Sequence, residues 1–375
     1  MKEPLIETAK ENQTDRIKSK LVQLKQKDKD FSVSGSKNHK YNVNEKISRK
    51  KLMEWERANQ VRLPEHFALF LTEVGNGGAG PYYGIYELDE AVSFSALEAL
   101  TSKCVLYPNM PNEEWNLLTV PLVRVKDYSY DETDAAYEKV MGGMLCIGTQ
   151  GCEYNMYIVI EGEHKGKVVY TADFYKDSPF FFVYESNFLD WYERWLDENI
   201  LGYNTTWFGF KMPGDESELI RVYQNAPSDD IKSDALDGML KFPKMSQTSI
   251  DFLKGIADQN QNRKEAIRLI CKYSFDDGIP YISEMLKSKV EDKILSVLQN
   301  LHWYGRVSDK QAFTREIIES FSCIQEPETL RFAGYVLEPI GRITIEDYEP
   351  FLCHPNPEMR KAAIYATRDC GNKAE

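Results

Sequence analysis

The chain has 375 residues, of which 42% are hydrophobic and 28% are charged. This length suffices for two domains, and the composition is typical of a globular protein. The net charge is −13, and residues 1–50 carry 13 basic and 7 acidic side chains against 33 and 52 in the rest of the chain. A body this acidic argues against nucleic-acid binding, because phosphate contacts supply most of that affinity, and it favours a basic partner.

No apolar run is long enough to span a bilayer, so no membrane association is expected. The first residues lack the apolar stretch of a secretory signal, and the seven cysteines show no tight spacing. We therefore expect a cytoplasmic protein with reduced thiols.

Residues 1–46 are polar and predict a partly disordered leader. Ile17, Leu21 and Leu24 occur at helical spacing, which is compatible with a short amphipathic helix. The stretch from Lys25 to Glu45 is charged and turn-prone, and we expect it to be mobile. An alternative role in contacting an acidic surface, including nucleic acid, is less favoured because acidic residues interrupt the lysines.

Residues 47–210 predict an α+β domain. Helical patterns at 47–59 and 64–74 come first, and Pro64 suits the first turn of the second helix. The six residues 75–80 fit the pattern G-x-G-x-x-G. In a dinucleotide site, however, this pattern follows a strand and opens a helix, whereas here it follows a helix. We therefore do not expect a nucleotide site.

Strand patterns and a closing helix complete this domain. The expected strands are 81–88, 118–126, 143–149, 154–161 and 166–173. Glycines separate the last three, which predicts an antiparallel meander. The closing helix is expected to start at Ser186 as its N-cap, and Phe188, Trp191, Tyr192 and Trp195 give it one apolar face.

The order of short motifs in this region is similar to that of a known superfamily. A glutamate lies seven residues before a Leu-Pro pair, and an aromatic-rich helix and an Asn-Gly-Gly turn follow. The residues are Glu56, Leu63, Pro64, Phe67, Phe70, Leu71, Asn76, Gly77 and Gly78. Together with the mid-domain run 143–151 and the closing helix, they resemble the SUKH superfamily, which includes fungal regulators of cell-wall synthesis and bacterial immunity proteins. The resemblance implies an antiparallel sheet with packed helices.

After an expected linker at 211–216, helical periodicity dominates residues 217–375. Helical runs are expected at 217–224, 248–257, 279–287, 311–321 and 344–352, and each precedes one of five similar segments. These segments contain Lys232, Arg263, Lys293, Arg331 and Arg360. Such a repeat predicts helix pairs that stack into a solenoid. The last unit, with Asn-Pro-x-x-Arg-x-Ala-Ala at 356–363, resembles a HEAT repeat.

The residues that could carry chemistry are poorly placed for it. None of the five histidines has a partner at ligand spacing, and Cys353-His354 with Cys370 lacks a fourth ligand. Cys146 has no nominated base and is expected to pack as a small apolar residue. We therefore expect no metal, no cofactor and no enzymatic activity.

Two exposed segments are the predicted partner-binding sites. The first is the carboxylate-rich loop 127–134, which combines acidic residues with aromatic ones, as interface hot spots do. A metal site, a catalytic acid/base pair and a surface loop with no binding role are the alternatives for this loop. The second follows the glycine turn, where strand alternation would place Tyr82 and Tyr83 on opposite faces. The predicted contact residues are Tyr82, Tyr83, Asp127, Tyr128, Asp131, Glu132 and Asp134.

The resemblance implies a function for these surfaces. Immunity proteins of the SUKH superfamily bind a polymorphic or contact-dependent toxin and block it in the cytoplasm. We therefore expect a non-enzymatic antidote whose acidic surface covers a basic toxin domain. The alternative is a scaffold or regulator, since SUKH domains also occur in proteins that coordinate signalling and cell-wall synthesis.

Overall fold

The computed structural model describes residues 4–172, 174, 178–259 and 261–368. The chain divides into two compact units. Unit 1 is Met1–Pro213 with Lys241–Pro243, and unit 2 is Gly214–Leu240 with Lys244–Glu375. The expected mixture of helices and antiparallel strands is confirmed.

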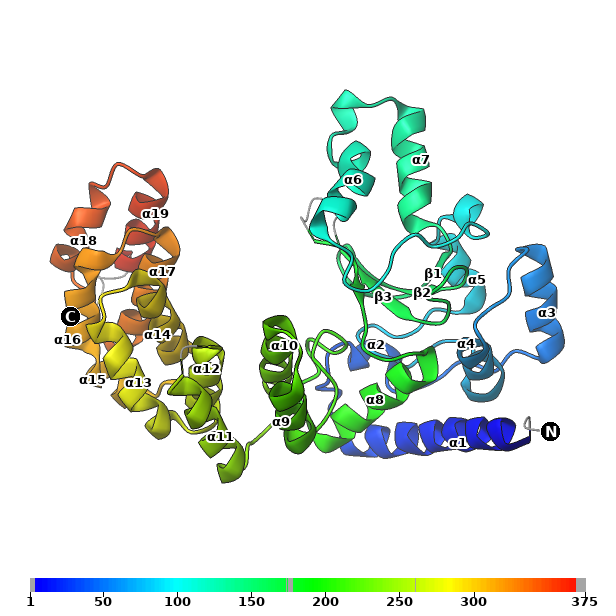
Figure 1. Ribbon diagram of the computed structural model, residues 1–375, viewed down its shortest axis with the longest axis horizontal. Helices are drawn as coiled ribbons and strands as arrows, with labels where there is room; N and C mark the ends of the chain where they lie inside the picture. The colour runs from blue at the N-terminus through cyan, green and yellow to red at the C-terminus, as the bar shows by residue number, and fades with distance from the viewer. Residues whose placement is uncertain (1–3, 173, 175–177, 260, 369–375) are drawn as a thin grey trace. The chain divides into compact units, whose positions relative to one another are not determined.

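A four-stranded antiparallel sheet in the order β1-β2-β3-β4 lies at the centre of unit 1 (Figure 1). The strands are β1 (Met144–Gly151), β2 (Tyr154–Val159), β3 (Val168–Thr171) and β4 (Phe181–Phe182). Their side chains alternate between two separate cores. Leu145 and Ile158, which pair across β1 and β2, belong to one core, whereas Cys146 and Tyr157 belong to the other. Because a core covers each face of the sheet, the strands consist of nearly continuous runs of apolar residues.

The larger core lies on the side of the sheet where Figure 1 shows α1 and α8. Its helices are α1 (Pro4–Lys27), α3 (Arg49–Ala58), α4 (Glu65–Leu69), the π-helical turn η1 (Phe70–Val74) and α8 (Phe188–Leu201). Aromatic rings dominate the packing. The ring centre of Phe188 lies 4.8 Å from that of Phe67 and 5.1 Å from that of Phe70, and the ring centres of Phe70 and Tyr192 lie 4.8 Å apart. The apolar face predicted for the closing helix is therefore a core face.

The other core is covered by two helices that follow one another in the chain. These are α6 (Asn112–Val123) and α7 (Tyr130–Met141), joined by the 3-10 turn η3 (Val125–Asp127). Figure 1 shows both helices standing on the side of the sheet opposite α1 and α8. The shorter helices of unit 1 are α2 (Ser36–His39), α5 (Leu88–Ser93) and η2 (Leu97–Ala99).

The motif that carries the family resemblance has a structural role. The Glu56 Oε1 atom accepts the Leu63 N–H at 2.8 Å, and the Asn76 Oδ1 atom accepts the Leu88 N–H at 3.1 Å. Gly78 has a φ of 98°, and a Cβ atom there would lie 2.6 Å from the Asn42 carbonyl oxygen. These residues shape the loops on which the core is built.

Two predictions for unit 1, the mobile leader and the N-cap of the closing helix, are wrong. The leader is not a mobile tail: Ile17, Leu21 and Leu24 of α1 are buried in the larger core, as is Tyr41. The helix predicted from the spacing of these three residues is therefore present. It is ordered because its apolar face packs against α8. The N-cap of α8 is Asn187 instead of Ser186, because the Asn187 side chain accepts the Asp190 N–H.

Two predicted strands are also wrong. Residues 118–126 lie in α6 and η3, where Trp115, Thr119 and Leu122 are buried at helical spacing. Residues 81–84 form a tight turn in which Tyr82 and Gly84 have φ values of 54° and 102°, and Leu88 already begins α5. In this stretch only Ile85 forms a bridge, and its partner is Gly78.

Unit 2 is helical throughout its described residues. Its helices are α9 (Glu216–Asn225), α10 (Asp229–Met239), α11 (Gln247–Ala257), α12 (Arg263–Tyr273), α13 (Phe275–Lys287), α14 (Glu291–Tyr304), α15 (Val307–Ala312), α16 (Thr314–Ser320), η4 (Phe321–Cys323), α17 (Pro327–Leu337), η5 (Glu338–Ile340), α18 (Ile345–Leu352) and α19 (Pro357–Thr367). Four of the five predicted helical runs each correspond to a single helix, whereas 311–321 is divided among α15, α16 and η4 with a break at Phe313; the five segments that follow the runs are all helical. The second helices of the pairs, α10, α12, α14, α17 and α19, pack side by side in that order.

Candidate partner-binding surface

The α6–α7 hairpin, residues 112–141, is held on the sheet by an aromatic core. Trp115 is fully buried, and its ring lies 4.7 Å from Phe180. Val140 and Met141 at the end of α7 are buried in the same core. The hairpin is therefore anchored at its base, which leaves its outer surface fixed in position while it faces solvent.

A capping box fixes the turn into α7. The Ser129 Oγ atom accepts the Glu132 N–H at 3.3 Å, and the Glu132 Oε2 atom accepts the Ser129 N–H at 2.9 Å. Bonding to the Ser129 backbone lowers the pKa of Glu132, since it favours the charged carboxylate. Glu132, predicted as a partner contact, thus has a first role in ending the loop and starting the helix.

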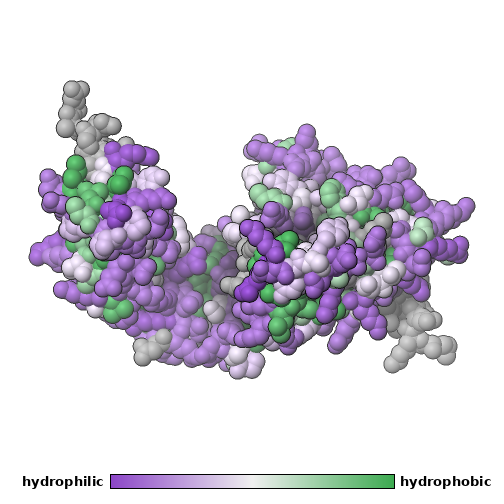
Figure 2. All heavy atoms as spheres, turned by 90° about the horizontal axis from the view of Figure 1, so that it is seen from above, coloured by the Kyte–Doolittle hydropathy of each residue, from purple (hydrophilic) through white to green (hydrophobic). Residues whose placement is uncertain are grey.

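The hairpin exposes large apolar side chains. Leu117 on α6 is 78% exposed and Tyr130 on α7 is 81% exposed, and Val125 in the turn is half exposed. Figure 2 views the molecule from the side of the hairpin and shows hydrophobic residues among hydrophilic ones on this face. Several large apolar residues exposed on one small element are typical of an interaction surface.

The same hairpin is rich in acidic side chains. The hairpin contains seven Asp and Glu residues but only three Lys and Arg residues. Asp127, Asp131 and Asp134 are exposed, and Tyr128 is partly exposed between them. On α7 the positions of Tyr130, Asp134 and Tyr137 fall on one helical face. The hairpin can therefore present apolar anchors and negative charge to the same partner.

The structure separates the predicted contact residues. Asp127, Tyr128, Asp131, Glu132 and Asp134 all lie on the hairpin. Tyr82 does not belong to a surface: it is only 8% exposed, and its hydroxyl donates to the Phe208 carbonyl at 2.8 Å. The prediction for Tyr82 is wrong because its segment is a turn, so strand alternation does not apply. Tyr83 is exposed, but it lies beside Gly151 at the end of β1 and not on the hairpin.

Leu117, Val125 and Tyr130 are not among the contact residues predicted from the sequence. The strand predicted at 118–126 gives no indication of which apolar residues of α6 face solvent. The signal that could have found them is the helical spacing of Trp115, Thr119 and Leu122, which leaves Leu117 on another face.

The structure places Cys146, which the sequence analysis considered as a nucleophile, in the core beneath the hairpin. Burial raises the pKa of the Cys146 thiol to about 11, so it stays protonated in its strand. Among the residues placed by the structure, no group of three or more His, Cys, Asp or Glu side chains could hold a metal ion. Cys370 lies outside the described residues.

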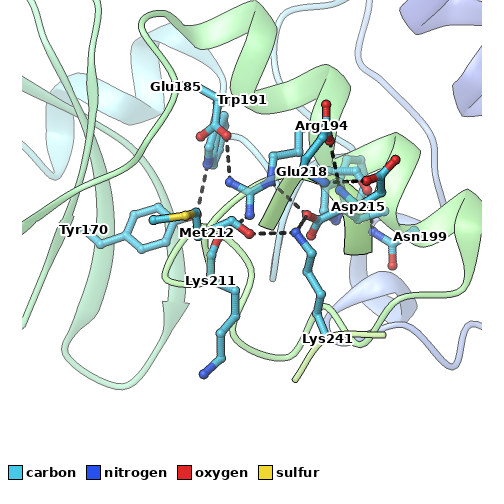
Figure 3. A network of polar contacts seen from close by, with 12 residues as sticks. Tyr170, Glu185, Trp191, Arg194, Asn199, Lys211, Met212, Asp215, Glu218 and Lys241 are labelled. Carbon is cyan, nitrogen blue, oxygen red and sulfur yellow. Dashed lines mark hydrogen bonds and ion pairs between the residues drawn. The ribbon is translucent and has the colours of Figure 1, made fainter. Parts of the chain in front are cut away.

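A second polar constellation, inside unit 1, is an ionic network shown in Figure 3. Arg194 on α8 pairs with Glu185 at 2.6 Å and with Glu198 at 2.9 Å, and Lys241 pairs with Glu198 at 2.8 Å. Lys241 also donates to the Met212 carbonyl oxygen at 2.7 Å and is 1% exposed. Two cations and two carboxylates balance each other away from solvent, which is a structural arrangement.

Comparisons of the chain with protein-family models, with curated proteins and with solved structures find no match. Among the helices that the structure describes, none has both the length and the apolar character needed to cross a bilayer.

Proposed function

We propose that this chain is a non-enzymatic binding protein that neutralises a toxin by direct contact, as SUKH immunity proteins do. The observation that carries the proposal is the α6–α7 hairpin, which presents Leu117 and Tyr130 among exposed carboxylates. The partner that suits this surface is a basic domain with an apolar patch. Its charge would be attracted by the acidic hairpin, and burial of the apolar side chains would slow dissociation.

The motif resemblance supports the same proposal from another direction. Glu56 and Asn76 hold their loops by accepting backbone N–H groups, which gives the motif residues a physical reason to occur together. The proposed mechanism is occlusion of the toxin's active cleft, and it needs no catalytic group on this chain. The cytoplasm is the proposed place of action, because the toxin acts there.

A scaffold or regulatory role is the second candidate. Unit 2 supports it, because rows of packed helices can present extended binding surfaces. The two roles differ in their genetics. An antidote gene adjoins a toxin gene, and its deletion alone harms the cell, whereas a scaffold needs neither.

The test begins with purification of the tagged chain from its own cells at low and at high salt. We expect one stoichiometric partner that ends in a small basic domain and that is lost at high salt. Several substoichiometric housekeeping proteins would contradict the antidote role and support the scaffold.

Charge reversal then locates the contact. We expect Asp127→Lys, Asp131→Lys and Asp134→Lys together to slow association by about tenfold or more, because electrostatic attraction is replaced by repulsion. Glu132 is left unchanged because it caps α7. The control is Asp30→Lys, Glu45→Lys and Glu54→Lys, which changes the net charge equally at exposed positions outside the hairpin. Equal association rates for the two triple variants would place the contact elsewhere.

A further inference from the structure

Unit 2 carries an aromatic cluster that its own core does not cover. The Trp303 and Phe332 ring centres lie 5.7 Å apart, those of His302 and Tyr335 lie 5.3 Å apart, and those of Phe332 and Tyr335 lie 5.6 Å apart. His302 and Trp303 belong to α14, and Phe332 and Tyr335 to α17, so the cluster joins two neighbouring helices. We call these four residues the aromatic face.

The aromatic face is partly exposed. Trp303 is 46% exposed and Tyr335 is 47% exposed, although both have aromatic neighbours. Tryptophan, tyrosine and arginine are the residue types that most often dominate binding energy at interfaces. Arg268 of α12 supplies the third type, since its guanidinium lies 5.3 Å from the Trp303 ring centre.

Charge is unevenly distributed between the helices of unit 2. The second helices α10, α12, α14, α17 and α19 contain nine basic and nine acidic residues, and four of these acidic residues belong to α10. The first helices α9, α11, α13, α15, α16 and α18 contain five basic and twelve acidic residues. The aromatic face therefore lies on the less acidic row of helices, next to α12 with its four basic residues.

Two arginines at the aromatic face have no carboxylate of their own. In the described part of the chain, neither Arg268 nor Arg331 forms an ion pair. Arg331 is exposed and precedes Tyr335 by one helical turn, so the two share a face of α17. A carboxylate from outside would find two unpaired cations beside exposed rings.

We propose that the aromatic face docks an acidic segment of a partner protein that also carries apolar anchor residues. Carboxylates of the segment pair with Arg268 and Arg331, and an aliphatic side chain packs on Trp303 and Tyr335. This inference is independent of the proposed function, because it concerns unit 2 and a partner of the opposite charge.

The probes are three synthetic peptides of equal length, titrated against the full chain by fluorescence anisotropy. One contains Asp, Glu and Leu, the second has Lys in place of the acids, and the third has Ser in place of Leu. We expect saturable binding of the first peptide and at least about tenfold weaker binding of the other two. Absence of binding of the first peptide, or equal binding of all three, would overturn the proposal. So would equal binding of a single-stranded oligonucleotide of the same net charge.

Matched variants locate the site. We expect Arg331→Glu to weaken binding of the acidic peptide by about tenfold, because it replaces attraction by repulsion. Arg315→Glu changes the charge equally on α16, away from the second helices that carry the aromatic face, and should leave affinity within about twofold. Tyr335→Ser should weaken binding with no change in its salt dependence, whereas Trp207→Ala, an exposed tryptophan of unit 1, should not. If Arg331→Glu and Arg315→Glu behave alike, the peptide does not bind at the aromatic face.

Discussion

His39 is a buried histidine whose surroundings favour the neutral imidazole. Its Nδ1 atom accepts the Tyr41 N–H at 3.0 Å, and its ring lies edge-on to Tyr41 and Trp195 at 5.3 and 5.9 Å. Burial lowers the pKa of His39 to about 4, although the nearby Asp28 carboxylate opposes this shift. A histidine in the unfolded chain has a pKa near 6.5. Between pH 4 and pH 6.5, His39 is therefore mostly neutral in the folded protein and mostly protonated in the unfolded chain.

This difference predicts a loss of stability as the pH falls from about 6.5 towards 4. The lowered pKa contributes on the order of 3 kcal/mol to the free energy of unfolding at any pH above 6.5. This contribution decreases as the pH falls from about 6.5, the pKa in the unfolded chain, to about 4, the pKa in the folded protein. Between pH 7.5 and pH 5 we expect His39 alone to account for a loss of about 2 kcal/mol in the free energy of unfolding. Urea unfolding at both pH values measures this loss.

His39→Gln is the control variant. It keeps an acceptor for the Tyr41 N–H but cannot be protonated, so the loss of stability between the two pH values should be smaller in this variant by about 2 kcal/mol. An identical loss in both proteins would show that His39 does not titrate on unfolding.

At the scale of elements, the capping box at Ser129 and Glu132 explains how one loop can be both acidic and ordered. We expect Ser129→Ala to lower the free energy of unfolding by about 1 kcal/mol, because it leaves the Glu132 N–H without its partner. Glu132→Ala should also lower it, because the Ser129 N–H then loses its acceptor. Glutamine can serve the same capping box, so Glu132→Gln should cost less than Glu132→Ala while it removes the charge. Denaturant unfolding of the three variants tests this. If Glu132→Gln costs as much as Glu132→Ala, the charge matters more than the cap.

The same hairpin shows why only part of the fold could be predicted from the sequence. The three meander strands were predicted because their glycine turns and apolar runs are local signals. In α6, the run Leu117–Val123 is rich in strand-forming residues, yet Trp115, Thr119 and Leu122 pack against the sheet and impose a helix. The predicted acidic residues were found on one element, but the exposed apolar residues beside them depend on which face of α6 is covered. That face is chosen by contacts distant in sequence, which periodicity in one short window does not reveal.

At the scale of the whole molecule, the sequence suggested a single linker at 211–216, whereas the chain enters unit 1 again at Lys241–Pro243. Lys241 is buried in unit 1, and burial lowers its pKa against the pull of Glu198, while Phe242 lies 5.0 Å from the Tyr203 ring centre. No composition shift marks this short segment, since its neighbours on both sides are helices of unit 2. A lysine in a helical region is normally interpreted as a surface residue, and only the tertiary partner Glu198 shows otherwise.

Lys241 should therefore stabilise unit 1 although it lies among the helices of unit 2 in the sequence. Lys241→Met leaves Glu198 with Arg194 as its remaining ion-pair partner among the described residues, and breaking a buried pair in this way typically costs about 3 kcal/mol or more. Tryptophan fluorescence can follow unit 1 separately, because Trp55, Trp115, Trp191, Trp195 and Trp207 belong to it and Trp303 to unit 2. We expect Lys241→Met to lower the denaturant midpoint seen by fluorescence. Adding Glu198→Gln should restore part of it, because Lys241→Met leaves one cation, Arg194, with two carboxylates, and the second substitution removes this excess negative charge.

Lys293→Met is the control for this effect, because Lys293 on α14 forms no ion pair among the described residues. It should move neither the fluorescence transition nor the helical transition seen by far-ultraviolet circular dichroism by more than about 0.5 kcal/mol. If Lys241→Met shifted the circular-dichroism transition and left the fluorescence transition unchanged, Lys241–Pro243 would stabilise unit 2 and the ionic network would matter little. A shift confined to fluorescence would mean instead that unit 1 is completed by residues beyond its apparent end, so that a chain cut at Pro213 lacks part of its own core.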